Sequence, residues 1–302
     1  MKPDERKKFR LPGARSEEAQ DGESEEEEGK EDFPRYEKDS EYGGFRTQLL
    51  RRRIEDQRDR RTFQKVFDAQ TLDAVQALAQ KGLFDVLEHI ISTGKEAHVF
   101  VSRDTNANKR AVKIFKKETS DFRRMNEYIA GDIRFKDLPH DRRSLVLAWT
   151  RKEYKNLLIA SKARLAVPLP LGMKENVIVM EFIGWGQEGA PRLKDIRPTM
   201  QELLPYREQA VDFMAGLYLA GLVHADLSEY NILVHDGGKG AGPRLVVIDF
   251  AQALLVRHPN ARDFFERDVA NMANYFTKAG LATGYDEMYR MVKEAKEKMQ
   301  KK

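Results

Sequence analysis

Cysteine is absent from this sequence of 302 residues. Its absence excludes disulfide bridges, thiolate zinc sites and cysteine nucleophiles, and it fits a reducing compartment. The sequence also has no apolar run of membrane-spanning length, and its N-terminus lacks the apolar core of a signal peptide. We therefore expect a soluble, cytoplasmic protein that has no membrane partner.

Histidine is scarce, with six residues in the whole chain. His98, His140 and His258 do not stand at the spacing of metal ligands, so a histidine metal site is not expected.

Charged residues make up 34% of the chain, but the two signs are separated along it. Residues 17–32 consist mostly of Glu, Asp, Ser and Gly, and such a stretch cannot bury enough apolar surface to fold. We interpret residues 1–45 as a disordered acidic arm. The next segment, 46–66, is expected to be helical and basic, and its cations are Arg46, Arg51, Arg52, Arg53, Arg58, Arg60, Arg61 and Lys65.

Two interpretations of this basic segment stay open. A cluster of cations on a helix is typical of contact with RNA. Alternatively, the segment is a solvated helix face on which Glu55, Asp56 and Asp59 are interleaved with the cations.

The remaining sequence predicts strands first and helices later, which indicates an α+β chain in two lobes. Residues 67–184 are expected to form a small, β-rich N-lobe that begins with a helix from Thr71 to a stop at Gly82. Its expected strands are 86–91, 97–102, 110–115 and 177–182, and its expected long helix is 145–160. The polar stretch 116–143 is expected to be a flexible loop or a weakly held helix.

A helical C-lobe is expected over residues 185–302. Its predicted helices are 206–220, 263–278 and 286–298. Between the first and second of these lies a short β-branched run, 245–248, which is typical of a buried strand.

Three polar residues of this C-lobe carry the strongest chemical signal. Asp226 and Asn231 stand five residues apart on one loop, and Asp249 follows the buried strand. Two of these side chains, Asn231 and Asp249, offer oxygen ligands for Mg²⁺, while Asp226 can accept a proton from a hydroxyl group. The set is what a protein needs to move a phosphoryl group from a metal-bound nucleotide to a hydroxyl.

A hydroxyl-rich turn in the N-lobe is the candidate phosphate site. Ser92, Thr93 and Lys95 surround a single glycine between the first two strands, where backbone N–H groups can approach phosphate oxygens. The turn has neither the G-x-G-x-x-G pattern nor a Walker pattern, and alone it is a weak signal.

Lys113 lies on the third strand between apolar neighbours. One interpretation is a solvent-facing lysine; the other is a lysine that binds ATP phosphates and pairs with a glutamate on the next helix. Glu153 is the preferred partner because its helix is well patterned, and Glu127 is the competitor. Adenine is expected to bind backbone groups of Glu181 and Ile183, where the strand reaches a glycine.

Two further polar residues near the loop are expected to be structural. His224 is expected to bridge the catalytic loop and the segment around Asp249. Asp268 is expected to form a salt bridge within a helix or between elements.

Taken together, these residues resemble the RIO atypical serine kinases, and most closely the type-one branch in its archaeal form. The resemblance runs from about Phe67 to about Val292. It is carried by STGKEA at 92–97, the stretches 112–114, 128–135, 152–157 and 179–184, LVHADLSEYNIL at 222–233, and ERDV at 266–269. The strings STGKEA and LVHADLSEYNIL are highly specific.

The resemblance implies a two-lobed, protein-kinase-like fold with a trimmed activation segment, which binds ATP and Mg²⁺ or Mn²⁺. By matching position, Lys113 binds ATP phosphate, Asp226 accepts the proton, and Asn231 and Asp249 bind the metal. Expected activities are phosphorylation of serine, on partners and on itself, and ATP hydrolysis through an aspartyl-phosphate on Asp249. Expected partners are the small ribosomal subunit precursor and its RNA, in the maturation of that subunit, with no DNA.

Several features depart from ordinary protein kinases. Ala225 replaces an arginine of the catalytic loop, and Ala251 replaces the glycine that usually follows Asp-Phe. The chain between Asp249 and the helix at 266–268 is short, and a glycine-rich hairpin at 236–243, expected at the surface, separates the two metal ligands.

Two other functions remain open from the sequence. A small-molecule phosphotransferase of the aminoglycoside or choline kinase type shares the catalytic loop pattern. A nucleotide-sensing assembly factor with little kinase activity, working as an ATPase switch, has the same residues.

Overall fold

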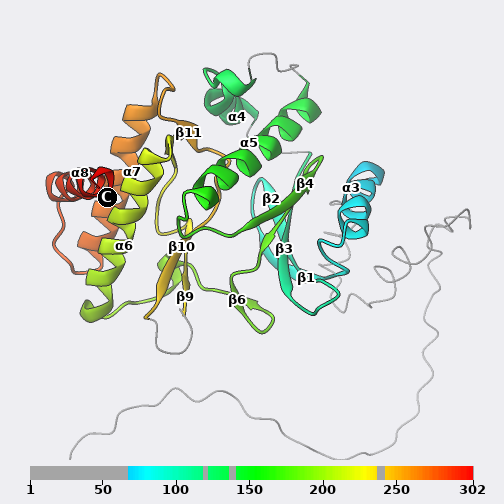
Figure 1. Cartoon of the computed structure of the whole chain (residues 1–302), viewed down its shortest axis with the longest axis horizontal. Coiled ribbons are helices and arrows are strands. Elements are labelled where there is room, and N and C mark those ends of the chain that lie inside the picture. The colour runs from blue at the N-terminus through cyan, green and yellow to red at the C-terminus, as the bar shows by residue number, and fades with distance from the viewer. Residues whose placement is uncertain (1–66, 118–121, 136–140, 237–241, 302) are drawn as a thin grey trace, which may run out of the picture. The chain divides into compact units, whose positions relative to one another are not determined.

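The computed structural model describes residues 67–117, 122–135, 141–236 and 242–301. The predicted acidic arm and basic segment therefore lie outside the described residues. The rest is an α+β chain in which five strands before residue 182 form the main sheet and three long helices lie after residue 199 (Figure 1). None of the described helices is both long enough and apolar enough to cross a membrane.

The N-lobe is built on an antiparallel five-stranded sheet. Its order is β1 (Val86–Thr93), β2 (Ala97–Arg103), β3 (Lys109–Phe115), β5 (Val177–Glu181) and β4 (Pro170–Lys174). Helix α3 (Ala69–Gln80) packs against β4 and β5, and its N-terminus is capped by Asp68, which accepts from Thr71 N. The strand β4 was not among the predicted elements.

The two faces of the sheet belong to two apolar cores. On β3, Val112 and Ile114 pack in the core that includes α3, while Ala111 and Phe115 pack in the core that includes α5 (Arg142–Lys162). Side chains alternate along a strand, so Lys113 shares the face of Ala111 and Phe115. It is only 8% exposed, and the solvent-facing interpretation of this lysine is wrong.

The described part of the C-lobe contains three α-helices: α6 (Met200–Leu219), α7 (Ala261–Lys278) and α8 (Tyr285–Gln300). Helix α6 begins six residues before its predicted start. Thr199 and Glu202 form a capping box there, with Glu202 accepting from the Thr199 backbone N–H at 2.7 Å. Two short turns, η1 (Ile133–Phe135) and η2 (Leu193–Asp195), and a small hairpin of β6 (Gly184–Trp185) and β7 (Glu188–Gly189) complete the connections.

Two short ladders bring the chemically important loops together. Strand β8 (Leu222–Val223) pairs with β11 (Leu254–Leu255), and β9 (Ile232–His235) pairs with β10 (Arg244–Val247). The loop 224–231 joins β8 to β9, and the segment 248–253 joins β10 to β11. Because each loop is anchored at both ends by the other's strands, the two lie side by side, with the Asn231 carbonyl accepting from Ile248 N at 2.9 Å.

The stretch 116–143 was predicted as a flexible loop or a weakly held helix, and the structure describes residues 116–117, 122–135 and 141–143 of it. It contains helix α4 (Phe122–Ile129), and Met125, Tyr128 and Ile129 are all buried. The Tyr128 ring packs against Trp149 of α5 and Phe264 of α7, with ring centroids 6.1 and 5.1 Å away. Tertiary packing, which the local sequence does not reveal, holds this short polar helix.

The burial of Tyr128 leads to a stability prediction. Replacing Tyr128 by Ala removes an aromatic ring that bridges α5 and α7, so we expect the free energy of unfolding to fall by about 3–5 kcal/mol. Urea unfolding followed by far-ultraviolet circular dichroism measures this. Tyr285→Ala, at a side chain that is 39% exposed, is the matched control and should cost much less. Equal losses in the two variants would contradict the packing role of α4.

Candidate active site

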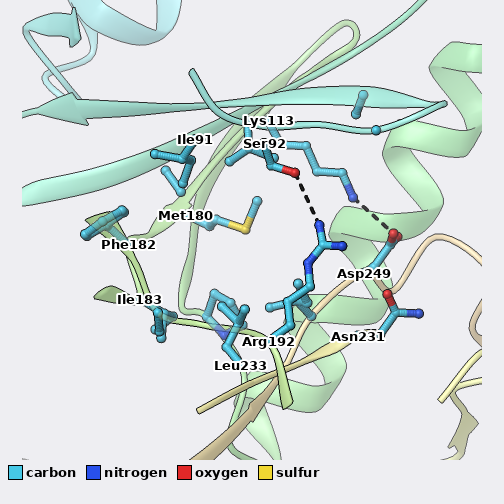
Figure 2. Close-up of a pocket in the computed structure, with 18 of the residues that line it drawn as sticks. Ile91, Ser92, Lys113, Met180, Phe182, Ile183, Arg192, Asn231, Leu233 and Asp249 are labelled. Atoms are coloured by element: carbon cyan, nitrogen blue, oxygen red, sulfur yellow. Dashed lines mark hydrogen bonds and ion pairs between the residues drawn. The ribbon is translucent and has the colours of Figure 1, made fainter. Parts of the chain in front are cut away.

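A cavity of about 680 Å³ lies where the turn after β1, the strands β3 and β5 and the two C-lobe loops meet (Figure 2). The predicted site residues that line it are Ser92, Lys95, Lys113, Glu153, Glu181, Ile183, Asn231 and Asp249. Asp226 is not among the lining residues, but it contacts two that are. Thr93 does not line the cavity, and its hydroxyl lies 3.2 Å from His98 Nδ1.

One cation and two carboxylates form the electrostatic centre of the cavity. Lys113 Nζ donates to both carboxylate oxygens of Glu153 at 2.7 Å and reaches Asp249 Oδ1 at 3.3 Å. The sequence paired Lys113 with Glu153 on α5, and the structure places these side chains in contact. Glu127, the competitor, is exposed on α4.

Burial and charge act in opposite directions on these groups. Burial disfavours the charged form of Lys113, but Asp249 and Glu153 outweigh it and raise its pKa above the ordinary value. Burial likewise acts to raise the pKa of Asp249, but the Lys113 ammonium group outweighs it, so that this pKa lies below its usual range. Asp249 is therefore ionised at neutral pH.

The catalytic loop holds Asp226 beside Asn231. Asn231 Nδ2 donates to the backbone carbonyl of Asp226 at 2.8 Å and to its carboxylate at 3.0 Å, and Gln252 Nε2 donates to the same carboxylate oxygen at 3.2 Å. The amide nitrogen of Asn231 is thus committed to Asp226. The side-chain oxygen of Asn231, Oδ1, points toward Asp249 (Figure 2).

Asp268 holds the backbone of this loop instead of forming the predicted salt bridge. Its two carboxylate oxygens each accept at 2.8 Å, one from Ala225 N and the other from Leu227 N. Burial raises the pKa of Asp268 to about 7, against the pull of these two donors. The predicted salt bridge is not found among the described residues. The sequence could not predict the actual contacts, because backbone N–H groups on an irregular loop have no recognisable sequence pattern.

His224 bridges the two loops, as expected. Its Nε2 lies 3.2 Å from the Ile248 carbonyl, and its ring packs edge-on against Phe250 at 5.0 Å. Burial lowers the pKa of His224 to about 4, so the ring is neutral and Nε2–H donates to the carbonyl. Its place in this contact leaves it a structural residue.

The end of the cavity at which the sequence predicts adenine is lined by Met180, Phe182 and Ile183 (Figure 2). The Ile183 carbonyl accepts from Ala190 N at 2.9 Å, so only the N–H of Ile183 is left for a base. The backbone N–H of Glu181 donates to the Leu169 carbonyl at 2.8 Å.

Arg192 is a cavity residue that sequence reasoning missed. Its guanidinium points into the cavity and donates to Ser92 Oγ at 3.3 Å (Figure 2). Of the three cavity cations, Lys95, Lys113 and Arg192, only Lys113 has an ion pair among the described residues. No motif surrounds Arg192, so only the folded chain reveals it.

The donor chemistry of the site fits a magnesium–nucleotide complex better than a protein-only metal cluster. Within the described residues, no group of three His, Cys, Asp or Glu side chains is arranged to hold a metal. Asn231 Oδ1 and the ionised Asp249 are hard oxygen ligands, and Mg²⁺ is usually held by one or two such groups together with phosphate oxygens.

Comparison with known proteins gives a consistent result. The RIO domain family matches residues 98–288. The RIO-type serine/threonine-protein kinase Rio1 of Haloferax volcanii is 42% identical over 80% of this chain and 81% of its own. Rio1 of Thermoplasma acidophilum is 40% identical over 61% and 92%. The human serine/threonine-protein kinase RIO1 is 34% identical over 76% of this chain but 40% of its own length.

Solved structures agree on the fold. The Rio2 kinase of Chaetomium thermophilum matches in an ADP/Mg²⁺-phosphoaspartate complex with a TM-score of 0.55 and 17% identity, covering 78% of this chain and 77% of that one. A second structure of the same kinase matches with a TM-score of 0.51.

The depressed pKa of His224 predicts acid sensitivity. The ring is neutral in the folded state down to about pH 4, whereas an exposed histidine in the unfolded chain is protonated below about pH 6.5. Unfolding therefore takes up a proton, and stability should fall as the pH is lowered from about 6.5 towards 4. Urea midpoints measured across this range should decline less steeply in His224→Asn than in the parent chain. An identical slope in both would contradict a buried neutral His224.

Proposed function

Because this chain belongs to the RIO family of serine/threonine-protein kinases, we propose that it transfers the γ-phosphoryl group of ATP to serine hydroxyls in the cavity described above. The observation that carries the proposal is the convergence of Lys113, Asp249 and Asn231 at one end of that cavity, with Asp226 in contact with Asn231. These residues come from both lobes and belong to three separate parts of the chain.

Each side chain has a role in this proposal. Lys113 binds the phosphates of ATP, with Glu153 holding its ammonium group in the cavity. Asp226 accepts the proton of the attacking hydroxyl, and Gln252 and Asn231 fix the orientation of its carboxylate. Ser92 and Lys95 approach the phosphates from the turn after β1, and backbone groups of Glu181 and Ile183 bind adenine.

Asn231 and Asp249 would hold Mg²⁺ or Mn²⁺. The bound metal bridges phosphate oxygens and stabilises the charge that develops on them during transfer. The committed amide nitrogen of Asn231 orients its oxygen ligand before any metal arrives.

A second candidate activity is ATP hydrolysis through Asp249. A carboxylate oxygen of Asp249 would attack the γ-phosphorus, ADP would leave with the electrons of the broken phosphoanhydride bond, and water would hydrolyse the acyl phosphate. The structural neighbour Rio2, solved as an ADP/Mg²⁺-phosphoaspartate complex, supports this chemistry for that protein. The trimmed activation segment also supports ATP hydrolysis. Helix α7 begins at Ala261, so only residues 250–260 lie between it and Asp249.

The proposal extends to maturation of the small ribosomal subunit in the cytoplasm, with the subunit precursor and its RNA as partners. Its support is the family membership and the basic segment over 46–66, which lies outside the described residues. The family membership favours this role in subunit maturation over the function of a small-molecule phosphotransferase.

Substitution of the two carboxylates tests the chemistry. Asp226→Ala should lower phosphoryl transfer about 10²–10⁴-fold because the positioned proton acceptor is lost. Asp249→Asn should weaken the dependence on metal together with the rate. Glu208→Gln, on the C-lobe helix α6 and outside the cavity, is the control. Full turnover in both carboxylate variants would refute the assignment.

The form of the labelled product separates the two activities. After incubation with γ-labelled ATP and Mg²⁺, label is scored on the protein, in free phosphate and on added small-subunit particles. Acid-stable label on serine indicates a kinase, and alkali-labile acyl phosphate with free phosphate indicates the ATPase cycle. We expect the alkali-labile label to disappear in Asp249→Asn.

Arg192 gives a separate binding prediction. Its guanidinium should turn from Ser92 to a phosphate group, so Arg192→Ala should weaken ATP and ADP binding about tenfold, roughly one charge-assisted hydrogen bond. Adenosine, which lacks phosphates, should bind equally well to both proteins in calorimetric titrations. A parallel loss for adenosine would show that Arg192 shapes the cavity and does not contact phosphate.

A further inference from the structure

We infer that Lys152 and Asn156 are positioning residues, which fix the backbone of the metal-binding segment, residues 249–253, to helix α5. The role of this segment in metal binding rests on the proposed function. The attachment itself is a contact in the described structure.

The contacts run from one face of α5 to the backbone carbonyls of three residues in the segment. Lys152 Nζ donates to the carbonyls of Ala251 and Ala253 at 2.9 and 2.5 Å. Asn156 Nδ2 donates to the carbonyls of Phe250 and Ala253 at 2.9 and 2.8 Å. The two residues are four apart, so their side chains lie on the same face of the helix.

Burial shows that these are not ordinary core positions. Both side chains are fully buried, and no carboxylate pairs with Lys152 within ion-pair distance among the described residues. Burial lowers the pKa of Lys152 to about 7, although Asp132 opposes this. Asn156 Oδ1 is buried and has no hydrogen-bond partner within the part of the chain that the structure describes. At fully buried positions, apolar residues of similar volume usually give as much stability as charged ones or more. We therefore attribute the polar groups of Lys152 and Asn156 to their hydrogen bonds with the backbone carbonyls.

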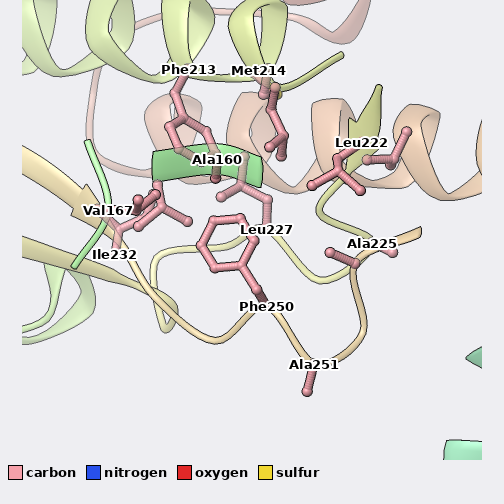
Figure 3. Packing of buried hydrophobic residues seen from close by; sticks show 14 of the residues in the cluster. Ala160, Val167, Phe213, Met214, Leu222, Ala225, Leu227, Ile232, Phe250 and Ala251 are labelled. Carbon is pink, nitrogen blue, oxygen red and sulfur yellow. The ribbon is translucent and has the colours of Figure 1, made fainter. Parts of the chain in front are cut away.

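The segment needs such support because its backbone is not regular. Asp249 has a φ of +67°, in the left-handed region that is unfavourable for a residue with a side chain. Such a conformation persists when the surrounding structure holds it. The buried ring of Phe250 packs edge-on against Phe213 of α6, which is a further attachment of the segment (Figure 3).

Helix α5 therefore holds both sides of the proposed phosphate and metal site. Glu153, the residue after Lys152, fixes Lys113 of the N-lobe sheet, and Lys113 in turn reaches Asp249. Moving α5 away from the cavity would break the Glu153 contact and the four bonds to the carbonyls together. The separation between the phosphate-binding lysine and the metal-binding aspartate is thus fixed by one helix.

The test uses Lys152→Met and Asn156→Leu, which remove the donors and approximately keep the shape of each side chain. Thr150→Val is the matched control, since Thr150 is buried on the same helix and its hydroxyl bonds the Val146 carbonyl within α5. Hydrogen–deuterium exchange of peptides covering residues 248–255 is measured on the full chain without nucleotide. We expect faster exchange in both donor variants and unchanged exchange in the control.

Metal binding is the second readout. Mn²⁺ is titrated by electron paramagnetic resonance into each protein saturated with ADP. The concentration for half-occupancy should rise about tenfold or more in the donor variants, as is usual when residues that orient a metal ligand are removed. Adenosine affinity, which depends on the distant adenine end, should not change. Thermal unfolding in the absence of ligand controls for loss of folding.

The outcomes are distinguishable. Unchanged exchange and unchanged Mn²⁺ affinity in folded donor variants would overturn the inference. Equal losses for Mn²⁺ and adenosine would also overturn it, because they would show a general structural role. Absence of Mn²⁺–ADP binding in the parent chain would instead refute the proposed function, and the exchange experiment would still decide the attachment of the segment to α5.

Discussion

The active site depends on one constraint: parts of two irregular loops are buried, and their buried backbone groups need hydrogen-bond partners from outside the loops. Side chains provide them. From α7, Asp268 accepts from the backbone of the catalytic loop, and from α5, Lys152 and Asn156 donate to the backbone of the metal-binding segment. A buried backbone group without a partner is costly, so each loop has one favoured position. Asp226, Asn231 and Asp249 inherit their geometry from that constraint.

The same constraint explains what the sequence could and could not predict. Lys113 and Glu153 were paired correctly because the strand and the long helix that present them have clear periodicity. The two-residue strands β8 and β11 have no period to detect, although they align the loops. The residue types at Asp226, Asn231 and Asp249 suggested the roles proposed for them, whereas the backbone partner of Asp268 depends on a turn 43 residues away.

Helix α4 shows a different limit. Its eight residues are too few and too polar to predict a stable helix, and its order comes from burial between two other helices. Arg267 of α7 donates both to Tyr128 Oη and to the Ala225 carbonyl in the catalytic loop. The segment expected to be flexible is therefore packed against the residue that supports the loop, and sequence patterns that act locally cannot report such a contact. Arg192 escaped notice for the same reason, since it gains meaning only from the cavity around it.

The charge balance of the cavity adds a final consequence for the proposed function. Lys113 is already opposed by two carboxylates, Glu153 and Asp249, and burial raises the pKa of Glu153 to about 7, so Asp249 is the more firmly ionised of the two. A triphosphate approaching this group alone would meet repulsion from Asp249. A divalent cation that binds Asp249 and the phosphates would turn this repulsion into attraction. Arg192, which has no ion pair among the described residues, adds a second favourable charge. Nucleotide and metal are thus expected to bind as one unit, because neither the lysine nor the aspartate can accommodate the phosphates without the ion.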